Sequence, residues 1–314
     1  MRVLITGGFG FIGGRLGQQL VEDGYDVLLG SRKPQDVPNW LPEAKVVHTN
    51  WNDKESLSGI CAGADIVVHA AGMNAKTCYS YPDQALAFNG SVTADLVACA
   101  VKQNVKKFIY ISTAHVYMAP LVGKITESSP TTNTHPYATS HLAGEEAVLK
   151  AARNAELDGV VVRLSNAIGA PTHSQVDCWM LIVNDLCRQA VSTGELNLKT
   201  SGNQFRDFVT LTDVCRVIEY FIKTDTNRLN SSVLNFGSGE SCTVIEMAHL
   251  IKDCCREFLN INPNLHRQVP QKKEKNIILD FQMTWLKLSD FILTNNFKLE
   301  VLQLLTFCQR YFKK

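Results

Sequence analysis

The sequence has no excess of charge of either sign, since 31 lysines and arginines face 30 aspartates and glutamates. A nucleic-acid-binding surface or an acidic interaction tail leaves an imbalance, so we expect neither kind of partner. No uninterrupted apolar run reaches the ~18 residues that span a bilayer, so we expect no membrane segment. The first strand-like residues, Arg2–Thr6, follow Met1 directly and leave no room for a signal peptide, which predicts a cytoplasmic protein.

The ten cysteines contain no CxxC pair, which is a common spacing in metal and redox sites. Most of them lie inside apolar periodic segments, as do Cys99, Cys187 and the adjacent Cys254 and Cys255. We therefore predict reduced thiols and no metal site. Repeats and low-complexity tracts are also missing, whereas 314 residues with 45% hydrophobic content are ample for a large core.

Short β-branched runs alternate with helical patterns over the first two thirds of the chain, which is typical of parallel βαβ units. The predicted strands are Arg2–Thr6, Asp26–Leu29, Lys45–His48, Ile66–His69, Phe108–Ile111 and Val160–Leu164. The predicted helices of this part are Phe11–Glu22, Pro82–Gln103 and Tyr137–Arg153.

The alternation breaks down after Gly169, as expected of a smaller lobe built from separated segments. Apolar spacing there predicts helices over Asp177–Ser192, Asp213–Lys223, Val244–Leu259 and Val301–Phe312. The polar stretch Pro263–Asn276 is interpreted as a loop with an exposed strand.

Three glycines, Gly7, Gly10 and Gly13, follow the first predicted strand and open the first predicted helix. This spacing gives a tight turn, lets the backbone approach a pyrophosphate, and allows close packing of helix on strand. Phe11 and Ile12 form the N-terminus of this helix, and a helix N-terminus stabilises the negative charge of a phosphate. In this position between strand and helix, the motif predicts a bound dinucleotide rather than a structural turn.

The end of the second strand indicates which dinucleotide is bound. NAD enzymes usually place a carboxylate there, which accepts a hydrogen bond from the ribose 2′-hydroxyl and repels a 2′-phosphate. This chain has Ser31 in that place, followed by Arg32, which offers a bidentate grip on phosphate. We therefore expect NADP as cofactor, with NAD as the alternative if Arg32 is only a solvated loop charge.

Several segments in the correct order resemble the extended short-chain dehydrogenase/reductases, in their nucleotide-sugar epimerase/dehydratase/ketoreductase group. The segments that carry the resemblance are Gly7–Gly13, Ile111–Tyr117, Tyr137–His141, Arg163–Pro171, Gly202–Val209 and Val233–Gly239. The resemblance covers nearly the whole chain and implies a nucleotide-sugar substrate. It also implies a homodimer, because the helices predicted at Pro82–Gln103 and Tyr137–Arg153 pair between subunits in this family.

The resemblance assigns catalytic roles to two of these segments. Tyr137 would exchange a proton with a sugar oxygen, and Thr113 would hydrogen-bond the reacting oxygen. The family places a lysine four residues after the tyrosine, on the same helix face, where it holds the nicotinamide ribose and lowers the tyrosine pKa. This chain has His141 in that position.

Further positions are assigned to ligands by the same resemblance. Asn50 and Trp51 would contact the adenine, whereas Asp53 is interpreted as a helix cap and His69 as a core histidine. Three small residues after the fourth strand leave room for cofactor: Ala70, Ala71 and Gly72. Two residues would meet the substrate, the second at its diphosphate: Asn166 and Arg206.

His141 decides how the activity is interpreted. Free histidine has a pKa near ~6.5, so a mostly neutral imidazole would leave the pKa of the tyrosine high. Three outcomes stay open. His141 still positions the cofactor but lowers the tyrosine pKa less than a lysine would, the cofactor pyrophosphate keeps the imidazole cationic, or catalysis is lost. A protonated tyrosine is already a competent acid, so the leading hypothesis is reduction of a 4-keto-sugar.

Two other functions remain as alternatives, a nucleotide-sugar 4-epimerase and a non-catalytic NADP-binding regulatory protein. A 4,6-dehydratase is not expected, because Ala114 and His115 stand where those enzymes carry an Asp-Glu pair after the threonine.

The fold class predicted from all of these features is α/β: a doubly wound, mostly parallel Rossmann-type sheet with a smaller C-terminal α/β substrate lobe. We assign residues 1–169 to the dinucleotide-binding domain, to which residues of roughly 203–240 return. The lobe is expected to take up most of residues 170–314.

Overall fold

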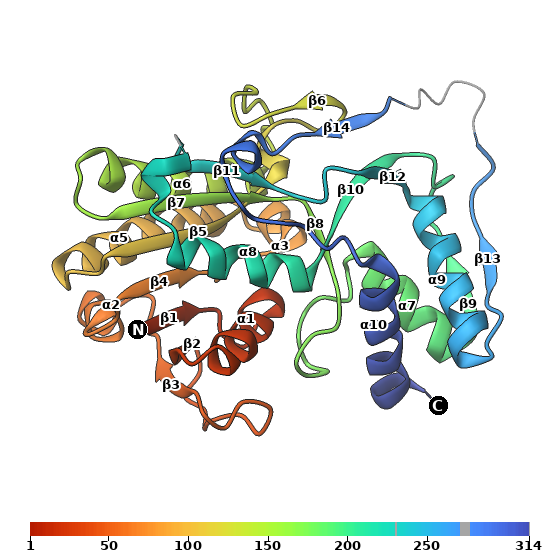
Figure 1. Ribbon diagram of the computed structural model, residues 1–314, viewed down its shortest axis with the longest axis horizontal. Coiled ribbons are helices and arrows are strands. Elements are labelled where there is room, and N and C mark those ends of the chain that lie inside the picture. Colours follow the sequence, from red (N-terminus) through yellow and green to blue (C-terminus); the bar gives the residue numbers. More distant parts are fainter. Residues whose placement is uncertain (230, 271–276, 314) are drawn as a thin grey trace.

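The computed structural model describes residues 1–229, 231–270 and 277–313, and its centre is a seven-stranded, fully parallel sheet (Figure 1). From one edge to the other the strands are β3 (Lys45–His48), β2 (Asp26–Ser31), β1 (Arg2–Thr6), β4 (Ile66–His69), β5 (Lys107–Thr113), β7 (Asp158–Leu164) and β11 (Val233–Phe236). The order of strands along the chain reverses between β1 and β4. In a doubly wound sheet the ligand crevice lies at this reversal, outside the carboxyl ends of the strands.

Helices cover both faces of the sheet, which confirms the predicted Rossmann-type fold. Strand β1 shows why: Val3 and Ile5 enter one hydrophobic core, while Leu4 between them enters the other. The first core is closed by α1 (Phe11–Glu22) and α8 (Leu211–Lys223). The second is closed by α2 (Lys54–Cys61), α5 (Thr93–Lys102) and α6 (Pro136–Arg153).

A separate core lies among the helices drawn on the right of Figure 1. These helices are α7 (Ile182–Thr193), α9 (Val244–Leu259) and α10 (Phe297–Phe312). A small sheet of β12 (Ser241–Thr243), β10 (Phe205–Thr210) and β8 (Asn166–Ile168) connects them to the main sheet. Two short parallel pairs complete the fold: β9 (Glu195–Asn197) with β13 (Asn264–His266) beside this core, and β6 (Gly123–Ile125) with β14 (Leu279–Phe281) against the residues that follow β5.

All six predicted strands are present, and β11 is a seventh strand that the sequence interpretation missed. The exposed strand expected within Pro263–Asn276 is β13, while residues 271–276 lie outside the described residues. The last helix begins at Phe297, four residues earlier than predicted, because Asn296 caps it by accepting a hydrogen bond from the backbone of Leu299.

The helix predicted over Pro82–Gln103 is present as one helical stretch that ends at Lys102, with a π-helical part in its middle. The segment consists of α4 (Pro82–Ala85), a π-helix η1 (Leu86–Val92) and α5, and it follows the short helix α3 (Ala75–Ser80). Within η1 the side chain of Asn89 turns inward, accepts from the backbone of Met73 and donates to the Ser140 hydroxyl. The wider turn of a π-helix accommodates this inserted contact.

The helix predicted over Asp177–Ser192 is present as α7, but it begins at Ile182, five residues later than predicted. Residues before it form consecutive turns, in which the backbone of Val176 donates to the carbonyl of His173. The Asp177 carboxylate instead accepts a hydrogen bond from Asn74, across the crevice end of the sheet. The remaining short elements are 3-10 turns at Ala114–Val116, Thr226–Leu229 and Thr284–Leu288.

One helical stretch in the described part of the chain, Pro82–Lys102, is long and apolar enough to cross a membrane by length and composition alone. Of its most apolar window, 44% is buried inside the protein, where it packs on α6 and α2. A core helix of a soluble protein passes the same test, so this stretch is weak evidence of a membrane segment.

All ten cysteines are free thiols, and nine of them are buried. Burial raises the pKa of Cys61, Cys178 and Cys215 to about 12, so these thiols stay protonated and unreactive at neutral pH. Within the described residues, no group of three or more histidine, cysteine or acidic side chains is placed to hold a metal ion.

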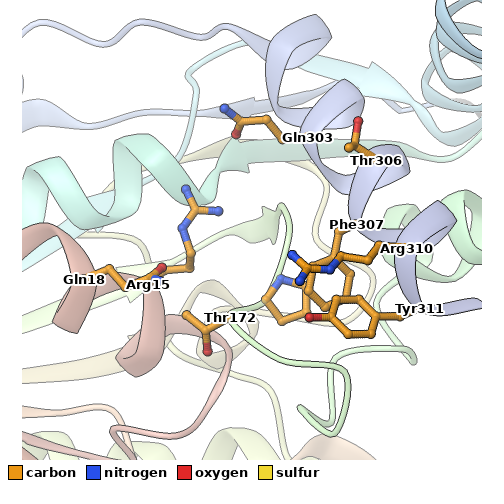
Figure 2. A pocket seen from close by; sticks show the side chains of 9 residues that line it. Arg15, Gln18, Thr172, Gln303, Thr306, Phe307, Arg310 and Tyr311 are labelled. Atoms are coloured by element: carbon orange, nitrogen blue, oxygen red, sulfur yellow. The ribbon is translucent and has the colours of Figure 1, made fainter. Parts of the chain in front are cut away.

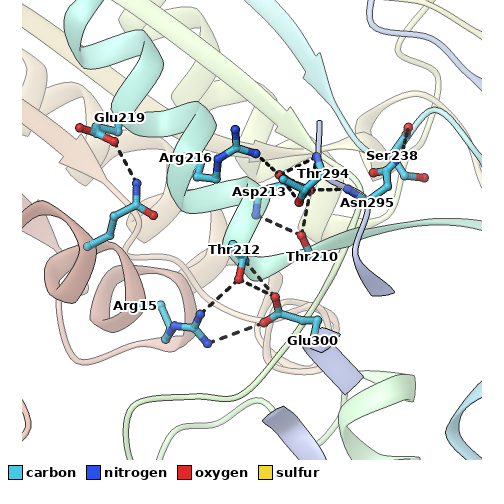
Figure 3. A network of polar contacts seen from close by, with 11 residues as sticks. Arg15, Thr210, Thr212, Asp213, Arg216, Glu219, Ser238, Thr294, Asn295 and Glu300 are labelled. Carbon is cyan, nitrogen blue, oxygen red and sulfur yellow. Dashed lines mark hydrogen bonds and ion pairs between the residues drawn. The ribbon is translucent and has the colours of Figure 1, made fainter. Parts of the chain in front are cut away.

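Buried carboxylates tie the C-terminal segment to the main sheet (Figure 3). Asp213 at the start of α8 accepts hydrogen bonds from the backbone and the hydroxyl of Thr294. Glu300 on α10 accepts from the backbone and the hydroxyl of Thr212, and its other oxygen lies 3.7 Å from Arg15 on α1. These contacts fix the last helix against the helix that follows the glycine-rich turn.

Candidate active site

The glycine-rich turn has a shape that only glycine permits. Gly7 has a φ of +68°, and a Cβ on Gly13 would lie 2.3 Å from the carbonyl oxygen of Gly7. A Cβ on Gly7 itself would meet the backbone nitrogen of Ala71 at 2.9 Å. Gly10 occupies the N-cap of α1 without a side chain, so the first amides of the helix at Phe11 and Ile12 are left for another acceptor. The turn fits the pyrophosphate of a dinucleotide.

The end of β2 is shaped by Ser31. Its buried hydroxyl accepts hydrogen bonds from the backbone of Lys33 and from the side chain of Gln35. Ser31 therefore holds the turn that carries Arg32, whose side chain is exposed. The structure places a cation next to the end of β2 and no carboxylate at the position of Ser31.

The segment after β3 is partly engaged within the protein. The Asn50 side chain accepts from the backbone of Asn52, and the Trp51 ring lies 5.3 Å from the ring of Phe88. Asp53 caps α2 by accepting from the backbone of Glu55, which confirms its interpretation as a cap.

His69 at the end of β4 is a core histidine, as predicted. Its Nδ1 lies 2.6 Å from the hydroxyl of Thr6, and its Nε2 lies 3.0 Å from that of Thr93. Burial lowers the pKa of His69 to about 3, so the ring is neutral. The segment Ala70–Gly72 follows at the carboxyl edge of the sheet, with Gly72 exposed.

Thr113 and Tyr137 are brought together by the fold. Thr113 ends β5, and the side chains of Thr113 and Tyr137 share a hydrogen bond. Tyr137 is half-buried in the first turn of α6, where His135 caps the helix by accepting from the Tyr137 backbone at 3.1 Å. Burial raises the pKa of Tyr137, and the hydrogen bond from Thr113 opposes this only in part. The phenol is therefore protonated at neutral pH.

His141 lies directly beside Tyr137, with the ring centroids 4.6 Å apart. It is buried, and burial lowers the pKa of His141 to about 4. Its Nδ1 lies 2.9 Å from the hydroxyl of Tyr110 on β5. A neutral imidazole thus occupies the place in which the resembled family has a permanent cation.

The same face of α6 carries Glu145, four residues after His141 and eight after Tyr137. The Glu145 carboxylate is buried, accepts from the Ser112 hydroxyl, and forms a bidentate ion pair with Arg163 on β7. The sequence interpretation missed this anchor and missed Tyr110. The spacing could have shown both, because Tyr110 and Ser112 share a face of β5 and meet residues four apart on α6.

Arg206 and Asp207 lie next to one another on β10 and point to opposite faces. Asp207 is fully buried and accepts from Ser165, Ser238 and the backbone of Gly239; burial raises its pKa to about 6. Arg206 is half-buried. Burial lowers the pKa of His115, and the positive charge of the nearby Arg206 lowers it further.

The two predicted substrate residues therefore differ in their surroundings. Asn166 donates to the carbonyl of Asp207 at 2.8 Å and so helps to join β8 to β10. Burial lowers the pKa of Arg206 because it disfavours the charged guanidinium. We expect an anion bound beside Arg206 to stabilise this charge. His115 lies between Arg206 and Tyr137, since Arg206 acts on its pKa and its ring centroid lies 6.4 Å from that of Tyr137.

His173 contacts the glycine-rich turn, with its Nε2 3.2 Å from the carbonyl oxygen of Phe9. Its ring stacks on Trp40 at a centroid distance of 5.9 Å. Together with the bond between Asn74 and Asp177, this contact brings residues 173–177 across the carboxyl end of the sheet.

A cavity of about 400 Å³ lies away from these residues, between α1, α10 and Pro171–Thr172 (Figure 2). Figure 2 shows Arg15 of α1 and Arg310 of α10 facing it from opposite sides. Arg15 donates to the carbonyl of Ala170 and pairs with Glu300, so the cavity belongs to the contact between α1 and α10. None of Thr113, Tyr137 and His141 lines it.

The fold and the glycine-rich turn together define a Rossmann-type protein whose site fits a dinucleotide. Residues 3–237 match the sequence profile of the NAD dependent epimerase/dehydratase family. The chain belongs to this family, whose relatives act on nucleotide-sugars as epimerases, dehydratases and dehydrogenases.

Three similar proteins show the range of the family. The dTDP-6-deoxy-L-talose 4-dehydrogenase (NAD(P)(+)) of Kitasatospora kifunensis is 33% identical over 261 residues, which cover 80% of this chain and 78% of that protein. The human dTDP-D-glucose 4,6-dehydratase is 27% identical over 298 residues, covering 87% and 83%. The structure of TunA, an NAD-dependent NDP-hexosamine 5,6-dehydratase of tunicamycin biosynthesis, has a TM-score of 0.77 at 25% identity, covering 98% of each chain.

Proposed function

We propose that this protein is an NADP-dependent reductase of a 4-keto group on a nucleotide-linked sugar. The observation that carries the proposal is the pair formed by Tyr137 and His141. The pKa of the tyrosine is raised by burial and the neighbouring imidazole is neutral, so the pair offers a proton at neutral pH. Reduction of a carbonyl consumes a proton, whereas oxidation of an alcohol needs a base.

The cofactor and three side chains would divide the steps of a reduction between them. A bound nicotinamide dinucleotide supplies the hydride, and the turn formed by Gly7, Gly10 and Gly13 would hold its pyrophosphate. Tyr137 donates its proton to the oxygen of the keto group. The Thr113 hydroxyl, which hydrogen-bonds Tyr137, would also hydrogen-bond that oxygen and hold it next to the phenol. Arg206 would form an ion pair with the substrate diphosphate, whose negative charge stabilises the half-buried guanidinium.

Two further observations support the choice of cofactor and reaction. The Kitasatospora relative is a dehydrogenase that acts at position 4 of a dTDP-linked deoxysugar and is named for NAD(P)+. In this chain Arg32 extends into solvent after Ser31, next to the expected ribose, as a site for a 2′-phosphate requires. The proposal excludes dehydration because Ala114 and His115 offer no carboxylate beside Thr113.

The second candidate function is a 4-epimerase, which the family membership supports. An epimerase first oxidises the sugar and therefore needs Tyr137 as a phenolate, which the raised pKa of Tyr137 opposes. It also keeps its cofactor through each turnover. The two functions thus differ in whether NADPH exchanges freely with solution.

The test is steady-state oxidation of NADPH and of NADH by the purified protein, with nucleotide-linked 4-keto-sugars as substrates. The proposal requires turnover that depends on keto-sugar, that is faster with NADPH, and that Tyr137→Phe abolishes. Tyr117→Phe is the matched control, because that buried hydroxyl bonds Asn235 instead. Retention of tightly bound NAD, with interconversion of sugar epimers and no net oxidation of NADPH, would overturn the proposal in favour of the epimerase.

A further inference from the structure

Tyr110 is a fully buried tyrosine whose hydroxyl reaches the active-site histidine. Its side chain is 1% exposed, and its oxygen lies 2.9 Å from Nδ1 of His141. Among the described residues, this hydroxyl has no other hydrogen-bond partner. The Tyr110 ring also stacks on His69 at a centroid distance of 5.5 Å, which holds the phenol in one orientation.

Gly144 makes the room for this contact. A Cβ at Gly144 would lie 2.6 Å from the Tyr110 oxygen and 2.5 Å from the carbonyl oxygen of Asn89. Glycine weakens the interior of a helix, so its presence in the middle of α6 needs a local reason. The close approach of the phenol oxygen to the helix backbone is such a reason.

The direction of the hydrogen bond follows from burial. Burial raises the pKa of Tyr110 well above its usual value, so the hydroxyl keeps its hydrogen. If His141 donated from Nδ1, the Tyr110 hydrogen would need a second acceptor in a fully buried place. A buried donor without a partner is costly, so the hydroxyl donates to Nδ1 instead. A neutral imidazole that accepts at Nδ1 carries its hydrogen on Nε2.

The other nitrogen of His141 faces the crevice. Nε2 lies 3.8 Å from the position of a Cβ on Gly72, and Gly72 is exposed after the carboxyl end of β4. The His141 ring also contacts the ring of Tyr137. A hydrogen on Nε2 therefore points to the region between the small residues after β4 and the proton donor.

We propose that Tyr110 is a positioning residue that fixes neutral His141 as the tautomer with its hydrogen on Nε2, so that His141 donates this hydrogen to the ribose of the bound dinucleotide. The inference rests on the proposed function for the identity of the acceptor, but not for the tautomer. It accounts for the loss of the lysine: a hydrogen-bond donor remains in place although the cation is gone.

The experiment compares the unmutated protein with Tyr110→Phe, which removes the hydroxyl and keeps the ring that stacks on His69. The ring nitrogens of His141, labelled with ¹⁵N, report the tautomer by NMR in the free protein, and His141→Gln assigns the signals. We expect the Nε2–H form in the unmutated protein and a mixture of both tautomers in Tyr110→Phe. The Kd for NADPH should rise in that variant by the inverse of the fraction of His141 that remains as Nε2–H, which is about 2-fold for an equal mixture.

Tyr117→Phe is again the matched control, since Tyr117 is as deeply buried and loses a hydrogen bond of 2.6 Å to Asn235. It should leave both the His141 tautomer and the Kd unchanged. An Nδ1–H tautomer in the unmutated protein, or an unchanged tautomer in Tyr110→Phe, overturns the inference. If the tautomer shifts as expected but no keto-sugar is reduced, the positioning role stands and the proposed function fails.

Discussion

Replacing His141 by lysine restores the charge that the chain lacks next to its proton donor. In the unmutated protein the pKa of His141 is lowered to about 4 and that of Tyr137 is raised. The phenolate that oxidation of a sugar alcohol needs is therefore scarce at neutral pH. His141→Lys places an ammonium four residues after Tyr137, on the same face of α6.

The size of the effect follows from the separation of the two side chains. Unit charges 4.6 Å apart, the distance between the two ring centroids, attract by about 3–4 kcal/mol at an effective dielectric constant of about 20. One pKa unit corresponds to about 1.4 kcal/mol, so this attraction would lower the tyrosine pKa by about 2–3 units. Burial of the new ammonium weakens the gain, and we expect a fall of about 1–3 units.

The assay is the pH dependence of kcat/KM in both directions. In His141→Lys the acid limb of the oxidation profile should move to lower pH by about 1–3 units. Reduction uses the protonated phenol and should change little near pH 7. Thr139→Lys is the control, because it adds the same charge to an exposed position of α6 two residues before His141.

Two results would refute this reasoning. Unchanged profiles in His141→Lys would mean that residue 141 does not act on Tyr137. An equal shift in Thr139→Lys would mean that the effect comes from net charge and not from contact with the phenol.

Four further predictions address the cofactor, the substrate and the stability of the fold. Arg32→Ala should weaken NADPH binding by ~1.5–3 kcal/mol and leave NADH binding nearly unchanged, as measured by titration calorimetry. Arg206→Ala should weaken binding of a nucleoside diphosphate without changing the Kd of NADPH. Glu145→Ala leaves a buried arginine unpaired and should lower the free energy of unfolding by about 3–5 kcal/mol in urea, whereas Glu146→Ala removes an exposed pair and should cost at most about 1 kcal/mol. His69 and His141 stay neutral in the fold but bind protons below about pH 6.5 when unfolded, so the free energy of unfolding should fall by roughly 2–3 kcal/mol per histidine between pH 7 and 4.5.

Three of these predictions have a direct outcome that would contradict them. Equal affinity of the unmutated protein for NADPH and NADH, or an equal effect of Lys33→Ala and Arg32→Ala, would remove the argument for a 2′-phosphate site. Unchanged nucleotide affinity in Arg206→Ala would make Arg206 structural. Flat stability between pH 7 and 4.5 would show that the buried histidines take up protons in the fold, and the exposed His48 provides the control as His48→Gln.

Local sequence pattern predicted most of the main sheet because all of its strands except the edge strand β3 are largely buried and the helices that cover them carry clear apolar stripes. The alternation of Val3, Leu4 and Ile5 between two cores is the physical basis of that signal. Pattern did not show where a side chain makes a specific tertiary contact, as at Asn89, which turns inward from a π-helix. Periodicity cannot reveal such a contact, since its partner Ser140 is distant in the sequence.

The site was predictable to the extent that its residues belong to short motifs. The positions of Thr113 and Tyr137 followed from such motifs, and the structure brings the two together. The residues behind them did not, because Tyr110 and Glu145 act through contacts between β5 and α6. A motif records the residues that meet the ligand, whereas the residues that hold them are fixed only by packing.

The clearance at Gly144 has a consequence for how this site can change by mutation. Residues 110, 141 and 144 form one combination, since the phenol oxygen needs both the space and the acceptor. A substitution at residue 141 alone would remove the acceptor of the buried Tyr110 hydroxyl. The effects of substitutions at these three positions are therefore expected to be non-additive, so that a change at one of them is less favourable than the same change made together with matching changes at the others.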